Sequence, residues 1–124
     1  MKLGLLSNPQ FFTALNKLLS TELPIKTAYK LKKEALKLEE ENKRYEEMRM
    51  SIINELSQKG EDGKPLANEN GSVKFLEGKE VVAIQKINGL LDIDIDCEGV
   101  SIDDLGDISL SATDLIILGD LIKD

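Results

Sequence analysis

The feature that most constrains this chain is a stretch of 35 residues, from 25 to 59, that contains neither glycine nor proline. Leu23-Pro24 marks a helix start, because the residue before a proline avoids helical geometry while the proline suits a first turn. Gly60 and Pro65 mark the stop, since glycine favours the left-handed end of a helix and proline bars its continuation. The sequence therefore predicts one helix from Pro24 to Lys59, about 50 Å long.

The apolar residues of this stretch follow a heptad pattern with two seam positions. The first position holds Ala28, Ala35, Asn42, Arg49 and Leu56, and the second holds Leu31, Leu38, Tyr45 and Ile52. Asn42 and Arg49 weaken the seam, because polar side chains at such positions need partners there. We therefore expect this helix to pack on other parts of its own chain rather than to form a long free coiled coil.

A shorter helix is predicted ahead of the long one. Ser7-Asn8-Pro9 places a capping side chain before a proline, whose missing N–H costs nothing in a first turn. Apolar residues then recur at spacings of three and four as far as Leu19, and the pattern ends near residues 20–22. Residues 1–60 are thus expected to form a helical hairpin.

The second half of the chain reads as short extended pieces followed by a helix. A β-hairpin is predicted over 66–75, because Asn-Gly at 70–71 is a strong hairpin-turn signal. Residues 79–90 fit either a helix or a strand, with helix favoured, and the period-two alternation of 91–97 predicts a strand with one wet face. Short extended pieces joined by acidic turns follow, and Ser111 to Asp114 have the form of a capping box that opens a last helix through Ile122.

These elements predict an α+β fold: a short and a long helix in a hairpin, then a small antiparallel sheet and a C-terminal helix. The 124 residues suit a single domain, with the helical hairpin over 1–60 and an acidic small-sheet region with the terminal helix over 61–124.

Charge is distributed unevenly along the chain. Residues 1–60 hold 11 Lys and Arg against 8 Asp and Glu, whereas residues 61–124 hold 5 against 15. One reading of this polarity is solubility alone, and another is head-to-tail contact between copies of the chain. The candidate interaction surface consists of Lys26, Lys30, Lys33, Lys37, Asp92, Asp94 and Asp96.

Composition argues against enzymatic chemistry. The chain has no His, so it lacks the usual general base, and its one cysteine, Cys97, has no histidine to activate it and reads as a small buried hydrophobe. Asp92, Asp94 and Asp96 have the spacing of the first half of a calcium loop, but Cys97 stands where the loop needs glycine and Asp103 where it needs glutamate. We therefore expect no catalytic residues, no metal, no cofactor and no small-molecule substrate.

Two further classes of partner are also disfavoured. A pI near 4.7 repels nucleic-acid phosphates at long range, so direct nucleic-acid binding is not expected. No run of residues reaches the roughly 18 apolar positions that a membrane span needs, and the first residues do not form a signal segment. The sequence predicts a protein partner or self-association instead.

Three segments carry a resemblance to a known group of proteins: residues 23–33 (LPIKTAYKLKK), 45–49 (YEEMR) and 61–65 (EDGKP). In this order they resemble small uncharacterised proteins of tailed bacteriophages and prophages, which have a short helix, a long Lys- and Glu-rich helix and an acidic C-terminal α/β tail. The resemblance carries no catalytic or binding residues. It implies a viral origin, with a place in the host cytoplasm during infection or in the virion.

Together these arguments predict a non-enzymatic phage protein that acts through protein–protein contacts in virion structure or assembly. The alternative is a small acidic inhibitor of a host nuclease or defence protein. Its carboxylates would imitate the phosphates of a nucleic-acid backbone and occupy the site at which that host protein binds nucleic acid.

Overall fold

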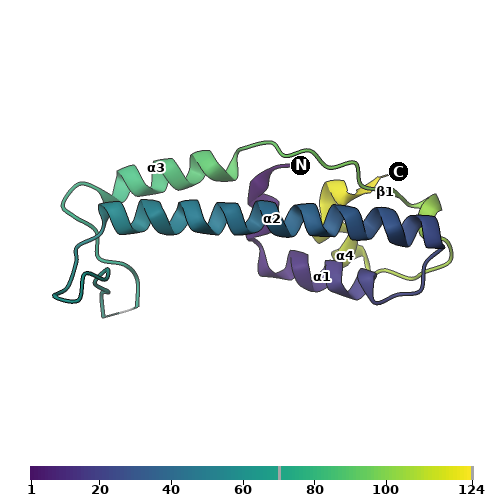
Figure 1. The fold of residues 1–124 in the computed structure, drawn as a ribbon, viewed down its shortest axis with the longest axis horizontal. Coiled ribbons are helices and arrows are strands. Elements are labelled where there is room, and N and C mark those ends of the chain that lie inside the picture. Colours follow the sequence, from purple (N-terminus) through teal and green to yellow (C-terminus); the bar gives the residue numbers. More distant parts are fainter. Residues whose placement is uncertain (70, 124) are drawn as a thin grey trace. The chain divides into compact units, whose positions relative to one another are not determined.

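The computed structural model describes residues 1–69 and 71–123, which contain four α-helices and two very short strands (Figure 1). Their contacts divide the chain into two compact units. Unit 1 combines residues 1–42 with residues 91–124, and unit 2 is residues 43–90. The single-domain organisation stays a prediction, because compact units of this kind can belong to one domain.

Unit 1 begins with a 3-10 helix, Leu3–Ser7, and the helix α1, Pro9–Leu19. The predicted cap is present, because the Asn8 side chain accepts a hydrogen bond of 3.0 Å from the Gln10 N–H and Pro9 occupies the first helical position. The buried residues of α1 are Phe11, Ala14, Leu15 and Leu18. The helix contacts the C-terminal helix α4, Ala112–Leu118, and the Lys17 ammonium donates a 3.1 Å hydrogen bond to Asp114 Oδ2 of α4.

The long helix α2 extends from Ile25 to Leu56, close to the predicted limits, and runs in the opposite direction to α1 (Figure 1). Its first 18 residues belong to unit 1 and its last 14 to unit 2. The predicted seam is the buried face: Leu31, Ala35 and Leu38 are buried in unit 1, and Tyr45 and Leu56 in unit 2.

The sheet of unit 1 differs from the predicted antiparallel one. Val100–Ser101 (β1) pairs with Ile122–Lys123 (β2) in parallel, with Val100 opposite Ile122. The prediction of an antiparallel sheet is wrong because the chain between the two strands is a crossover that contains α4, and such a connection returns the chain in the same direction. The terminal helix starts at the predicted cap, where the Ser111 Oγ accepts a 3.0 Å hydrogen bond from the Asp114 N–H, but ends at Leu118.

Residues 91–97 are also not the strand that their alternation predicts. Asp94 forms a single antiparallel bridge with Lys2, supported by the hydrogen bonds from Leu3 N to Ile93 O and from Ile95 N to Met1 O, each 2.8 Å. Leu91 still belongs to the helix that precedes this segment and Asp92 lies in a turn, so the strand-like pairing is limited to residues 93–95.

Unit 2 contains the end of α2, irregular turns and the helix α3, Glu80–Leu91, whose last residue already belongs to unit 1. Residues 79–90 are therefore mainly helical, as favoured. Isolated antiparallel bridges join Ser57 to Phe75, Lys59 to Pro65, and Ala67 to Val73. The last of these bridges lies within the predicted hairpin. Asn70, half of its Asn-Gly turn, is outside the described residues.

Candidate interaction surface

The helix α2 has a second apolar side within unit 1, which we call the outward face and define by Ile25, Tyr29 and Leu36. At about 100° per residue these three residues lie within a narrow arc, opposite the buried seam. Their exposed fractions are 83%, 74% and 56%. One face of α2 is therefore covered by the chain itself, whereas the other presents large apolar side chains to solvent.

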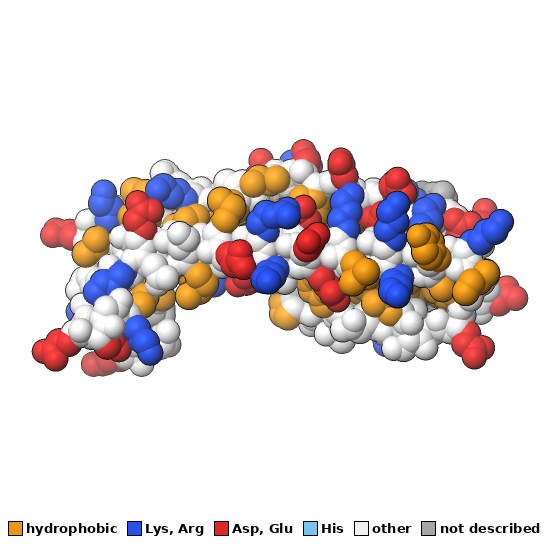
Figure 2. All heavy atoms as spheres, viewed as in Figure 1, with side chains coloured by type: hydrophobic (Ala, Val, Ile, Leu, Met, Phe, Trp, Pro, Cys, Tyr) orange, Lys and Arg blue, Asp and Glu red, His pale blue; other side chains and the backbone are white. Residues whose placement is uncertain are grey.

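Lysines border the outward face on both sides. On the helical wheel, Lys32 lies to one side, and Lys33 and Lys26 lie to the other. All three are exposed, whereas Lys30 and Lys37 are partly buried further round the helix. Figure 2 shows lysine and hydrophobic side chains interleaved over this part of α2. Of the four predicted lysines, Lys26 and Lys33 thus adjoin the outward face most directly.

The apolar members of this face were not among the predicted interaction residues. A signal for them exists in the sequence, because Ile25, Tyr29 and Leu36 recur at spacings of four and seven on the side opposite the heptad seam. A helix with apolar residues on both sides covers one side itself and leaves the other for a partner. The seam alone therefore gave an incomplete description of the helix.

The predicted aspartates form a separate, exposed row. Asp92, Asp94 and Asp96 are all exposed, and the Lys2 ammonium lies 3.5 Å from Asp92 Oδ1 and 3.3 Å from Asp94 Oδ1. The hydrogen bond with Asp94 raises the pKa of Lys2. Among the described residues no ion pair joins these aspartates to the lysines of α2, and no group of three or more acidic or cysteine side chains could hold a metal ion.

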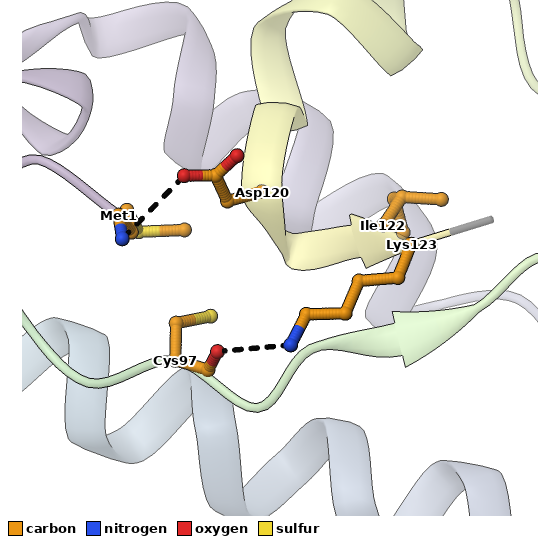
Figure 3. Close-up of a pocket in the computed structure, with 5 residues that line it drawn as sticks. All are labelled: Met1, Cys97, Asp120, Ile122 and Lys123. Carbon is orange, nitrogen blue, oxygen red and sulfur yellow. Dashed lines mark hydrogen bonds and ion pairs between the residues drawn. The ribbon is translucent and has the colours of Figure 1, made fainter.

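A polar pocket surrounds Cys97 where residues 95–97 approach β2 (Figure 3). Its volume is about 380 Å³, and it is lined by Met1, Cys97, Asp120, Ile122 and Lys123. The Met1 ammonium lies 3.4 Å from Asp120 Oδ2, and the Lys123 ammonium donates a 3.3 Å hydrogen bond to the Cys97 carbonyl. The two ammonium groups and the carboxylate that line the pocket thus already interact with other groups of the chain.

The thiol of this pocket is poorly suited to nucleophilic chemistry. Burial raises the pKa of the Cys97 thiol, and the negative charge of Glu34 raises it further, so the thiol stays protonated near neutral pH. Glu34 itself is only 2% exposed, and its Oε2 has no hydrogen-bond partner among the described residues. The Met1 ammonium, which lines the same pocket, lowers this pKa, but its effect is smaller than those of burial and of Glu34, so the thiol is not activated as a catalytic cysteine is.

The chain matches no family model, no curated protein and no solved structure. Within residues 1–69 and 71–123, none of the helices combines the length and the apolar character that crossing a bilayer requires.

Proposed function

We propose that this chain is a non-enzymatic binding protein that acts through protein–protein contacts made by the outward face of α2. The observation that supports this proposal is the exposure of three large apolar side chains in one row, Ile25, Tyr29 and Leu36, on a helix whose other side is already covered. Burial of each such side chain against a partner is worth about 1.5 to 3 kcal/mol. Large apolar side chains that lie exposed on one helix face and are rimmed by polar residues are typical of an interaction site.

The lysine border gives this face a preference for acidic partners. Lys26, Lys32 and Lys33 surround the apolar row with positive charge in a chain whose net charge is −7. Such charges raise the rate of association with an acidic surface and disfavour binding to basic proteins. Their contribution to specificity and association rate is larger than their contribution to affinity. Binding through this face is therefore expected to weaken as salt concentration rises. As part of the proposal, the partner belongs to virion structure or assembly, the role implied by the resemblance to phage proteins.

Affinity capture with matched variants tests this function. The tagged chain, its Tyr29→Ala/Leu36→Ala variant and a Met48→Ala control are expressed in the same cells, with and without phage infection, and the eluates are compared by mass spectrometry. Met48 is also an exposed apolar residue of α2, but it lies outside the outward face. We expect wild type and Met48→Ala to retain the same proteins and the double variant to lose them. Recovery of the same proteins with all three chains would refute a role for this face.

A specific observation also favours the inhibitor as a second candidate. Residues 91–123 carry 9 Asp and Glu against one Lys, and Asp92, Asp94 and Asp96 are all exposed. A row of exposed carboxylates can occupy the phosphate-binding site of a nucleic-acid-binding protein. Capture of a host nuclease by wild type, with loss on Asp92→Lys/Asp94→Lys/Asp96→Lys, would support this candidate. Retention of the nuclease by that triple variant would exclude it.

A further inference from the structure

A small apolar pocket opens on the C-terminal part of unit 1. Its volume is about 160 Å³, and its lining residues are Ile102, Leu105, Gly106, Ile108, Leu110 and Leu115. A dry cavity of about 150 Å³ in another protein holds a benzene ring. This pocket therefore has the size and the apolar character to receive one aromatic side chain.

The segment that forms the pocket is strongly acidic. Asp103 and Asp104 precede the lining residue Leu105, and Asp107 stands between the lining residues Gly106 and Ile108. All three aspartates are exposed, and none forms an ion pair with another residue of 1–69 or 71–123. A partner whose apolar side chain enters this pocket therefore binds most favourably when basic side chains beside it pair with these aspartates.

The outward face of α2 offers that combination, but not to the pocket of its own chain. The Thr27 hydroxyl donates a 2.8 Å hydrogen bond to the Asp104 carbonyl, which fixes the pocket segment on the inward side of α2. Tyr29 lies about 200° around the helix from Thr27 and points away from this segment. The two complementary surfaces of one molecule therefore cannot meet each other.

We propose that the pocket is the docking site for the outward face of a second copy of this chain, with Tyr29 as the inserted side chain. Lys32 and Lys33 of the incoming helix then lie near Asp103, Asp104 and Asp107. This inference rests on the proposed function and names the partner of the outward face. The contact joins two different surfaces, so a bound pair still has one pocket and one face free, and association proceeds to a ring or an open chain.

The first test is the concentration dependence of mass for the purified full chain by sedimentation velocity and light scattering at low salt. We expect association that weakens as salt is added. Tyr29→Ala should raise the dissociation constant about tenfold or more, because a central aromatic anchor contributes most of the energy of such an interface. The Met48→Ala control should associate like wild type. Circular dichroism of each variant shows that the fold is kept.

Mixing two defective variants tests the geometry itself. Tyr29→Ala/Lys33→Glu loses the face but keeps the pocket, whereas Asp103→Lys/Asp107→Lys loses the pocket but keeps the face. We expect each variant alone to be monomeric. Their mixture should form a 1:1 dimer and nothing larger, since it contains one intact face and one intact pocket for each pair.

Several outcomes would overturn this inference. A wild-type chain that is monomeric at every concentration excludes a second copy as the occupant, while capture of other proteins through the outward face would leave the proposed function in place. Self-association unaffected by Tyr29→Ala and no partner lost from the face variant would overturn both proposals. Tyr29-dependent binding of a monomeric chain to vesicles of anionic phospholipid would show instead that the outward face meets a lipid surface.

Discussion

Two leucines of α2, only two positions apart, allow the buried face to be tested with a built-in control. Leu38 is 0% exposed, whereas Leu36 is 56% exposed. Replacing either one with alanine removes the same three carbon atoms from the same helix in the same unit. The small difference in helix propensity between leucine and alanine is also the same at both positions. The difference between the two variants therefore isolates the contribution of burial.

Leu38→Ala should lower the free energy of unfolding by about 2 to 5 kcal/mol, because the variant loses transfer free energy and leaves a cavity that closes only in part. Leu36→Ala should stay within about 0.5 kcal/mol of wild type, as expected for a largely solvent-facing position. With a urea dependence of about 1 to 3 kcal/mol per molar, the unfolding midpoint of Leu38→Ala should fall by roughly 0.7 to 5 M.

The assay is urea unfolding followed by circular dichroism, at one protein concentration and at a salt concentration that suppresses association. If the slope of the unfolding free energy against urea concentration is the same in both variants, the difference between their midpoints reports a difference in stability. A changed slope would report a change in the surface exposed on unfolding. Equal midpoints for the two variants would refute the assignment of the heptad seam to the interior of unit 1.

Gly99→Ala should unfold at a lower urea concentration than Gly78→Ala. Both glycines have positive φ, 68° and 74°, but of the two only Gly99 would bring an added Cβ within 2.6 Å of a backbone carbonyl oxygen. Similar unfolding midpoints for the two variants would argue against that close approach. The hydrogen bond from Lys17 lowers the pKa of Asp114 below 3.8, so the pair's contribution to stability is present above the unfolded-state pKa and is lost as pH falls through the folded-state pKa. Lys17→Ala should accordingly be less stable than wild type at neutral pH and equal to it near about pH 2, and a difference that persists in acid would contradict the ion pair. Because burial raises the pKa of Cys97 above 9.0, iodoacetamide should alkylate it more slowly at neutral pH than it does a free cysteine, with a rate that still rises beyond pH 9, whereas an early plateau would point to an exposed, activated thiol.

Local signals in the sequence were sufficient for the helices but not for the strand pairing. The limits of α2 follow from Pro24 and Gly60, and the start of α4 follows from the Ser111 cap, because each signal acts within a few residues. The pairing of Val100 with Ile122 joins segments that are distant in the chain, so no local pattern specifies its direction. The alternation of 91–97 predicts a strand, but Leu91 is helical, Asp92 lies in a turn and only Asp94 forms a bridge, because a strand also needs a partner of its own length.

The candidate surface was predictable only in its charges. Charged side chains can be identified directly in the sequence and are usually exposed. The structure places four of the predicted residues at the surface in this way: Lys26, Lys33, Asp92 and Asp94. The apolar half of the surface depends on which side of α2 the rest of the chain covers, and that is a property of the tertiary structure. Tyr29 becomes informative only once the opposite side of its helix is known to be buried.

The composition of unit 1 from two distant segments has a consequence for the order in which the protein is made. Residues 1–42 and 91–124 are separated by 48 residues, and closing a flexible loop of that length costs roughly 3 kcal/mol of chain entropy. At ordinary rates of synthesis, residues 43–123 take about 4 to 16 s to follow residue 42 out of the ribosome. During that interval the residues of α1 and α2 that are buried in unit 1 lack the C-terminal residues that later cover them. Their apolar side chains are then accessible to chaperones. Unit 2 is continuous in the chain, and its earlier folding would shorten the loop that unit 1 must then close.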